Sequence, residues 1–504
     1  MIRSGPLADY TDVPVWRPYL DSLRSRAVKP IVVSKWLNAA SAVLSEKQKR
    51  ELAQKHFVSH IQPVMTAKRR PLPEVKHLDK AGIFPQDYVY DYGQSLAQNE
   101  LINIPKVHDL GISGRGVRVA VFDTGFRLNH LAFQQLHVVA AYDFINKDDI
   151  VDNEEGQDTG GQNWHGTIVL SMLAGFFPGQ LIGSAFSADF LLAKTEDVSS
   201  ETPVEEDNWI AAAEWADSLG ADVISTSLGY LDWYSYKDMD GKTAPITIAA
   251  DLAVKKGIVV VVAAGNEGDK SWHYIDAPAD GDSVITVGAV NSGGVLADFS
   301  SRGPTFDGRI KPDVVTMGVG NVGIAVPPRE GIGGGYTKIS GTSAACPMAA
   351  GVAALILSAY PNLTPMQVRE ALLKTADRAA TPDNDYGYGL VDAYAALMYW
   401  GEPQGLPEKS KLAGAYPNPF RVSKNHIMQI NFDLAQPTSV SAQVFNVLGQ
   451  HVKTFAKTLH TAGKNQRLLW NGQNDLGELL PSGIYFCNLK LGTETHHLKI
   501  TLLE

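Results

Sequence analysis

Apolar and polar positions along the middle of the chain follow two different periods. Short runs rich in β-branched residues, which are typical of buried strands, occupy residues 117–122, 221–225 and 258–263. Longer stretches with helical character separate and follow them, at residues 168–173, 207–219, 249–256, 349–359, 364–376 and 389–399. Strands that alternate with helices predict an α/β domain with a mainly parallel sheet.

The pattern changes towards both ends of the chain. Near the N-terminus, an α-β-β-α-β order is predicted at residues 19–27, 31–33, 39–43, 46–56 and 58–64. Near the C-terminus, short alternating stretches lie at residues 427–432, 440–445, 451–455, 466–470, 483–489 and 497–502. The second set, with turn residues between its members, predicts a β-sandwich of about ninety residues.

Two polar connectors separate these regions. Residues 65–85 have few apolar clusters and carry the basic run Lys68-Arg69-Arg70-Pro71, which is typical of an exposed connector where chains are cut. Residues 401–407 form a Pro/Gly linker. The predicted organisation is an N-terminal domain at residues 1–66, a connector at 67–91, an α/β domain at 92–402, a linker at 403–414 and a β-sandwich at 415–504.

Length and charge narrow the classes of function. A chain of 504 residues is too long for one ordinary core, and 44% hydrophobic residues is normal for globular protein. A net charge of −10 argues against nucleic acid or an anionic membrane as the main partner. The two cysteines, Cys346 and Cys487, predict no disulfide framework. The longest apolar run, around residues 348–360, is too short for a membrane span.

A glycine-bounded turn of small residues, Gly341 to Ser343, precedes the alanine-rich helix at residues 349–359. A serine that opens a helix has its backbone N–H among the unpaired donors of the first turn. That position suits a nucleophile whose substrate develops negative charge, and Pro347 is expected near the first turn. An ordinary serine cap of a helix would give the same local pattern.

Two earlier motifs carry an acid and a base. Asp123 ends the strand at residues 117–122, and a carboxylate at that end of a parallel strand faces the usual site crevice. His165, followed by Gly-Thr, leads into an apolar helix. Each has an ordinary structural interpretation, as a turn residue and as a packed histidine. His130 is a rival base near Asp123, but no Gly-Thr follows it.

Together these motifs resemble the subtilisin-like serine proteases, or subtilases, whose triad has the chain order Asp, His, Ser. Residues 263–268 (AAGNEG) resemble the oxyanion-hole segment of that family, and residues 227–229 (SLG) resemble its substrate-binding strand. The five motifs occur in family order over roughly three hundred residues. Asp123-Thr124-Gly125 also matches an aspartic-protease motif, but no second copy occurs. Cys346 and Met348 depart mildly from the family pattern.

The resemblance implies a serine endopeptidase on a three-layer subtilisin-like domain with a mainly parallel sheet. Ser343 would be the nucleophile, His165 the general base and Asp123 the residue that orients it. The Asn266 side chain would hold the oxyanion together with the Ser343 backbone N–H. A catalytically inactive surface-binding protein on the same scaffold is the competing hypothesis.

The resemblance also implies how a peptide substrate binds. One segment would pair with the substrate backbone as an added strand, and it comprises Ser227, Leu228 and Gly229. A second segment would wall the pocket for the residue before the scissile bond, and it comprises Ala263, Ala264 and Gly265. Small walls favour a large side chain, but these residues do not determine which one.

The N-terminal order of elements resembles the inhibitory propeptide of subtilases, a small ferredoxin-like domain. The protein would therefore be made as a zymogen, with its own propeptide as a partner beside protein or peptide substrates. The first strand of such a domain would lie upstream of Met1, and its loss would expose a sheet edge. We therefore expect that residues, including a signal peptide, precede Met1.

Two further features bear on localisation and metals. Residues 416–420 (YPNPF) and 481–486 (PSGIYF) resemble the C-terminal sorting domains of type IX secretion cargo, which implies a secreted or cell-surface protein and contact with that machinery. A generic accessory sandwich is the alternative. The acidic residues 146–155 could ligate structural calcium, as in many subtilases, although the twelve-residue calcium-loop pattern is absent and a solvated loop is the simpler interpretation. No cofactor is expected for the chemistry.

Overall fold

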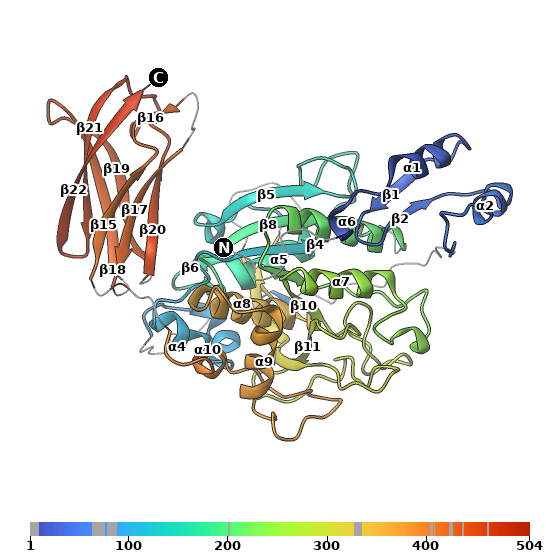
Figure 1. The fold of residues 1–504 in the computed structure, drawn as a ribbon. Helices are drawn as coiled ribbons and strands as arrows, with labels where there is room; N and C mark the ends of the chain where they lie inside the picture. The colour runs from blue at the N-terminus through green and yellow to red at the C-terminus, as the bar shows by residue number, and fades with distance from the viewer. Residues whose placement is uncertain are drawn as a thin grey trace. The chain divides into compact units, whose positions relative to one another are not determined.

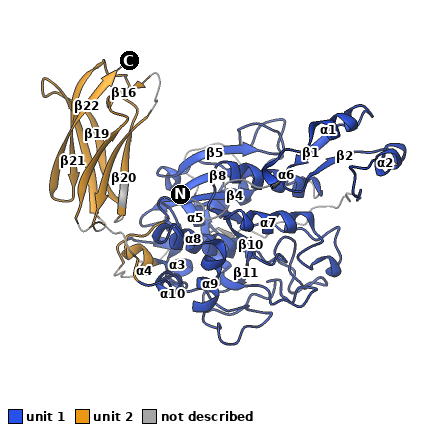
Figure 2. Ribbon diagram, viewed as in Figure 1, with its two compact units in different colours: residues 1–86, 90–104, 114–401 blue, residues 87–89, 105–113, 402–504 orange. Residues whose placement is uncertain are grey.

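The computed structural model describes most of the chain, and that part forms two compact units (Figure 2). The described residues are 10–62, 76–77, 88–199, 202–326, 335–403, 407, 409–422, 427–435, 438–460 and 463–503. The first unit comprises residues 1–86, 90–104 and 114–401, and the second comprises residues 87–89, 105–113 and 402–504. The predicted basic run at residues 68–71 lies outside the described residues, as do residues 404–406 and 408 of the predicted linker.

A seven-stranded sheet forms the centre of the first unit, with the strand order β12-β11-β10-β9-β4-β8-β5 (Figure 1). Every neighbouring pair in it is parallel, as the sequence predicts. Strands such as β10 are buried along their whole length, which explains their continuous apolar sequences. The bounds are β4 (Arg118–Asp123), β5 (His137–Asp143), β8 (Asp189–Lys194), β9 (Val223–Thr226), β10 (Val259–Ala263), β11 (Ile285–Val290) and β12 (Val314–Met317).

Helices cover both faces of this sheet, because successive side chains of a strand point to opposite faces. They are α5 (Trp164–Ala174), α6 (Val204–Ser218), α7 (Pro245–Lys255), α8 (Thr342–Ala359) and α9 (Pro365–Thr375), and the same unit also contains α3 (Leu96–Glu100) and α10 (Ala393–Met398). Helices α6 and α7 share a core cluster with the strand residues Ile224 and Val260. On the other face, Cys346 of α8 lies with its Sγ 3.9 Å from the Ser225 hydroxyl. The predicted three-layer arrangement is thereby confirmed.

Helix α8 crosses the middle of the first unit. Among the described helices, it is long and apolar enough to span a membrane by composition alone, although the sequence run at residues 348–360 had looked too short. Within the protein, 89% of that apolar window is buried. The apolar character of α8 is therefore explained by its place in the core.

The N-terminal region contains a two-stranded antiparallel sheet flanked by helices. Its elements are α1 (Arg17–Arg24), β1 (Pro30–Ser34), β2 (Ala39–Ala42) and α2 (Glu46–Ala53). A capping box at Ser45 and Gln48 fixes the start of α2. Residues 58–62 form no strand, so the described part of the last predicted extended segment does not extend the sheet.

The C-terminal part of the second unit is a β-sandwich, as the alternating sequence predicts. One sheet has the order β15-β17-β20 and the other β16-β22-β21-β18-β19. Their inner faces share a core that includes Phe432, Trp470 and Leu489. The bounds are β15 (Lys411–Tyr416), β16 (Phe420–Arg421), β17 (Met428–Leu434), β18 (Thr438–Asn446), β19 (His451–His460), β20 (Gly463–Trp470), β21 (Gly483–Leu491) and β22 (Glu494–Leu503).

Shorter elements complete the two units. In the first unit, β14 (Tyr336–Ser340) pairs with both β13 (Val319–Ile324) and β3 (Lys76–His77) and leads directly into α8. The others are β6 (Phe176–Phe177), β7 (Leu181–Ile182), α4 (Ile104–Asp109) and the 3₁₀ turns η1 (Tyr10–Asp12), η2 (Gly93–Ser95), η3 (Leu131–Phe133) and η4 (Tyr236–Asp238).

Candidate active site

The last residue of β4 and the second residue of α5 form a buried acid–base pair. His165 Nδ1 lies 2.8 Å from Asp123 Oδ1, and the two side chains are 5% and 0% exposed, respectively. The Thr124 backbone N–H also donates to Oδ1, at 2.7 Å. A buried carboxylate at this distance can accept the imidazole Nδ1–H and fix the orientation of the ring.

The glycine after the histidine makes this pair possible. A Cβ at Gly166 would lie 2.9 Å from the Asp123 Cβ, which is closer than side-chain carbons approach in folded proteins. It would also collide with the Gly125 carbonyl oxygen. Only glycine lets α5 start this close to the end of β4, which gives the His165-Gly166 dipeptide a steric reason.

Ser343 is the second residue of α8 and is 3% exposed. Its Oγ makes no hydrogen bond to the described part of the chain, and catalytic hydrogen bonds are often long before substrate binds. A Cβ at Gly341 would lie 3.0 Å from the Ser343 Oγ and 3.7 Å from the Asn266 Nδ2. Gly341 therefore leaves open the space between the serine hydroxyl and the asparagine amide.

Pro347 lies in the second turn of α8, so the expected place near the first turn is wrong by a few residues. A residue at this position would donate its N–H to the Ser343 carbonyl four residues earlier, and proline cannot. The Ser227 hydroxyl donates to that carbonyl at 2.9 Å instead. One predicted substrate-binding residue therefore also supports the helix that carries Ser343.

Asn266 is held by a residue that the sequence motifs did not single out. Its Oδ1 accepts the Thr342 backbone N–H at 2.9 Å and the Thr342 hydroxyl at 3.1 Å. With the amide oxygen occupied by these donors, the Nδ2 group remains as a donor for a substrate oxygen. Thr342 occupies the position before Ser343 in the Gly-Thr-Ser motif, so its adjacency to the serine was the available signal.

The two predicted substrate-binding segments leave the sheet at the same edge as Asp123. Residues 227–229 follow β9 and residues 263–265 lie at the end of β10, and these strands are paired with Val262 opposite Thr226. The strands are parallel, so their carboxyl ends share one edge of the sheet. The rival histidine, His130, caps η3, because its Nδ1 accepts the Ala132 backbone N–H at the start of that turn.

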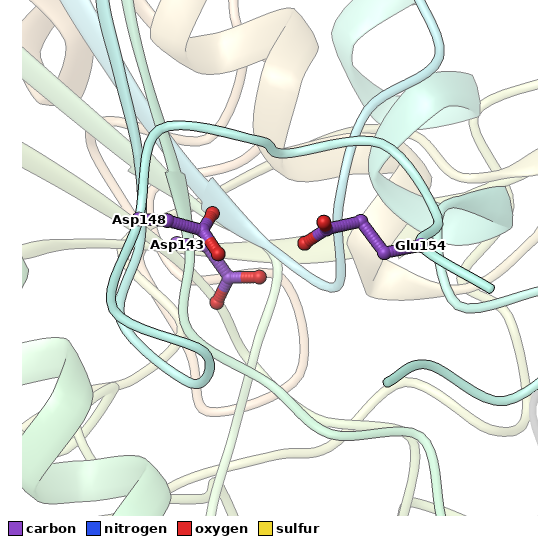
Figure 3. A group of neighbouring side chains, drawn as sticks. All are labelled: Asp143, Asp148 and Glu154. Carbon is purple, nitrogen blue, oxygen red and sulfur yellow. The ribbon is translucent and has the colours of Figure 1, made fainter. Parts of the chain in front are cut away.

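A group of acidic side chains lies at the end of β5 and in the loop that follows it. Oxygens of Asp143, Asp148 and Glu154 lie within 4.8 Å of one another (Figure 3). The buried Lys194 ammonium lies 2.7 Å from Asp143 and 2.6 Å from Asp158. Partial desolvation, followed by the charges of Asp148 and Asp158, raises the pKa of Glu154. The carboxylates outnumber the one lysine, which is the electrostatic setting of a cation site.

Comparisons with known proteins agree with this geometry. The subtilase family matches residues 114–389, a Bacteroidota propeptide domain of peptidase family S8 matches residues 3–77, and a secretion-system C-terminal sorting domain matches residues 414–502. Subtilisin E of Bacillus subtilis is 34% identical over 369 residues, which cover 72% of this chain and 82% of that protein. Subtilisin DY of Bacillus licheniformis is 36% identical over 300 residues, which cover 59% and 97%.

Solved structures share the fold. The MycP3 protease from the type VII (ESX-3) secretion system has a TM-score of 0.50 and 24% sequence identity, over 67% of this chain and 94% of that one. At this level of identity the likeness concerns the fold alone.

A buried Asp–His pair at the end of a parallel strand and a serine at the start of a core helix are features of the serine proteases that have an α/β fold. The chain belongs to the subtilase family. It is a serine endopeptidase with an N-terminal propeptide and a C-terminal secretion sorting domain, and it is secreted or displayed at the cell surface. Subtilases need no cofactor for catalysis, as predicted.

Proposed function

We propose that Ser343 is the nucleophile, His165 the general base and Asp123 its orienting carboxylate. The observation that carries this assignment is the buried contact of 2.8 Å between His165 Nδ1 and Asp123 Oδ1. It leaves the His165 Nε2 as the ring nitrogen for proton transfer. The Asn266 Nδ2 and the Ser343 backbone N–H form the oxyanion site, because both are donors beside the reacting hydroxyl.

The reaction then proceeds in two halves. The Ser343 Oγ attacks the scissile carbonyl carbon while His165 accepts the hydroxyl proton. Collapse of the tetrahedral intermediate breaks the C–N bond, and His165 returns the proton to the leaving amine. A water deprotonated by His165 next hydrolyses the ester on Ser343. This step releases the new carboxyl terminus and restores the serine hydroxyl.

A fluorophosphonate probe, which reacts with activated serines, tests the assignment. We expect labelling at one site, which peptide mapping places at Ser343. Labelling should disappear in Ser343→Ala and in His165→Ala. It should persist in Ser358→Ala, a matched serine at the other end of α8. Labelling that survives Ser343→Ala would contradict the assignment and would equally reject the competing idea of an inactive binding protein.

The propeptide, residues 1–66 in our assignment, inhibits the catalytic domain at residues 92–402 until the connector is cut. Contacts between its first hairpin and the catalytic helices support this. The Glu214 carboxylate accepts the Ser34 hydroxyl at 2.6 Å and the Trp36 backbone N–H at 3.1 Å. At the end of α7, Lys256 Nζ lies 2.9 Å from Asp12 Oδ1.

Trp36 is the anchor of this interface. Its side chain is buried and belongs to the same core cluster as Trp209 and Ile210 of α6. The Lys256 ammonium lies 6.0 Å from the centre of its ring. A large aromatic side chain inserted between helices is the usual energetic centre of a protein interface.

The β-sandwich, residues 415–504 after a linker at 403–414, delivers the protease through a type IX secretion machinery. Two residues of its motif Tyr416-Pro417-Asn418-Pro419-Phe420 have different roles. The Asn418 side chain donates to the Lys499 carbonyl and accepts the Thr501 N–H, each at 2.9 Å, so it fixes the motif to β22. Tyr416 is 74% exposed and is free for recognition by a partner.

Calcium binds at Asp143, Asp148 and Glu154. The donors are all carboxylate oxygens, which Ca²⁺ prefers, and Glu154 Oε2 has no hydrogen-bond partner among the described residues. The ion would tie the loop after β5 to the end of that strand. Its role is structural, since none of these residues belongs to the proposed catalytic group.

A further inference from the structure

The two predicted substrate-binding segments, residues 227–229 and 263–265, are here called the first and second wall segments. Each ends in a glycine, and one carboxylate lies against both glycines. A Cβ at Gly229 would lie 3.0 Å from the Asp276 Cβ and 3.2 Å from its Oδ2. A Cβ at Gly265 would collide with the same Oδ2 and with the Asp276 Cγ. The absence of side chains at both positions therefore leaves the Asp276 carboxylate as the group between the walls.

The backbone around Asp276 fixes this position from both sides. The Asp276 N–H donates to the Ala264 carbonyl at 3.2 Å, within the second wall segment. Ala277 and Tyr230 exchange backbone hydrogen bonds of 3.0 and 2.8 Å, just beyond the first wall segment. Residues 276–277 thus bridge the two segments and place an acidic side chain, 5% exposed, where the walls meet.

Such a position determines which side chain can enter. The substrate residue before the scissile bond is here called the acyl residue. If the two segments have the roles expected from the sequence, its backbone lies beside segment 227–229 and its side chain lies against segment 263–265. An apolar acyl residue would lie against the buried Asp276 carboxylate without offering it a hydrogen bond, which is costly. A lysine ammonium or an arginine guanidinium would supply a charge-assisted hydrogen bond instead.

We propose that Asp276 selects lysine or arginine as the acyl residue. The proposal rests on the proposed catalytic site and adds its substrate class. It adds a charge to the expectation from sequence that small walls favour a large side chain, because lysine and arginine are both large. The basic run Lys68-Arg69-Arg70 in the connector suits this selection, because it offers the enzyme a cationic acyl residue within its own chain.

A series of otherwise identical peptides tests the proposal with the mature enzyme. The acyl residue is arginine, citrulline, lysine or norleucine, so that each cationic residue has an uncharged partner of nearly equal shape. We expect kcat/KM to favour arginine over citrulline and lysine over norleucine by roughly 10- to 100-fold, the range of a hydrogen bond to a charged group. Asp276→Asn should bring both ratios close to one.

Asp269→Asn is the matched control, because it removes the same charge from an exposed position in the same loop. Both ratios should stay at the wild-type value in that variant. Equal cleavage of the charged and uncharged partners by the wild-type enzyme would overturn the proposal, and this readout does not depend on whether Asp276→Asn folds. Ratios that persist in a folded Asp276→Asn variant would also overturn it.

The same experiment distinguishes failure of this proposal from failure of the catalytic assignment. If every peptide remains uncut and Ser343 does not react with the fluorophosphonate probe, the catalytic assignment fails and the proposal fails with it. If Ser343 reacts and apolar acyl residues are cleaved best, the catalytic assignment stands and the role of Asp276 is wrong.

Discussion

The hydroxyl of Ser227 donates a hydrogen bond to the backbone carbonyl of Ser343 at 2.9 Å. In an uninterrupted helix that carbonyl would accept the N–H of residue 347, but Pro347 has none. The hydrogen bond therefore repairs a gap in α8 next to the proposed nucleophile. It also ties the proposed substrate-binding segment to the helix that carries the serine.

Removal of the Ser227 hydroxyl should destabilise the protein because it leaves a buried carbonyl without a partner. We expect Ser227→Ala to lower the free energy of unfolding by about 1–3 kcal/mol. Urea unfolding of protein with Ser343 blocked by the fluorophosphonate probe measures this without self-digestion. Pro347→Ala is the matched background, because it restores a backbone N–H to the helix. In that background, Ser227→Ala should lower the free energy of unfolding by a smaller amount. An equal decrease in both backgrounds would contradict the explanation.

The Asn266 amide should act mainly in the transition state. We expect Asn266→Ala to lower kcat by about 10²–10³ with little change in KM. This range is the one known for the corresponding donor in subtilisin, a member of the same family. Steady-state kinetics on one peptide provide the measurement. A loss confined to KM would mean that Asn266 binds substrate rather than the oxyanion.

Much of this architecture could be predicted from local patterns, and the rest depends on contacts between distant segments. Gly125 follows Asp123 by two positions and Gly166 follows His165 directly, and a Cβ at either glycine would collide with a backbone carbonyl oxygen. Their motifs are therefore recognisable in the sequence. Asp276 belongs to no such motif, and its place follows from the bridge between Tyr230 and Ala277. The hydrogen bond from the Ser227 hydroxyl to the Ser343 carbonyl could not be predicted from local sequence for the same reason, since 116 positions separate the two residues.

The Trp36 anchor should control how long the propeptide holds the enzyme inactive. In the full-length chain, we expect Trp36→Ala to shorten the lag before peptide cleavage begins, because loss of an interface centre of this kind costs about 2 kcal/mol or more. The activity of the fully matured enzyme should not change, since the residue is then removed. Trp16→Ala is the matched control, because Trp16 is 60% exposed. If the lag of Trp36→Ala equals that of the wild-type protein, Trp36 is not the residue that holds the propeptide in place.

Calcium should stabilise the mature enzyme through the loop after β5. We expect calcium at a hundred times its dissociation constant to raise the free energy of unfolding by about 2.7 kcal/mol, and EGTA to reverse the effect. Thermal unfolding of probe-blocked protein measures both. Asp148→Asn should reduce the calcium-dependent shift in Tm, whereas Asp149→Asn, at an exposed neighbouring position, should not. No shift in the wild type would reject the site.

The β-sandwich should be dispensable for chemistry and required for delivery. None of the proposed catalytic or substrate-binding residues lies in it, and its strands enclose their own core around Phe432 and Trp470. A chain that ends at Gly401 should therefore fold and cleave peptides with an unchanged kcat/KM. In the native host, the same truncation should stay inside the cell envelope while the full chain reaches the surface or the medium. A truncated protein that is unfolded or inactive in vitro would instead make the sandwich part of the protease.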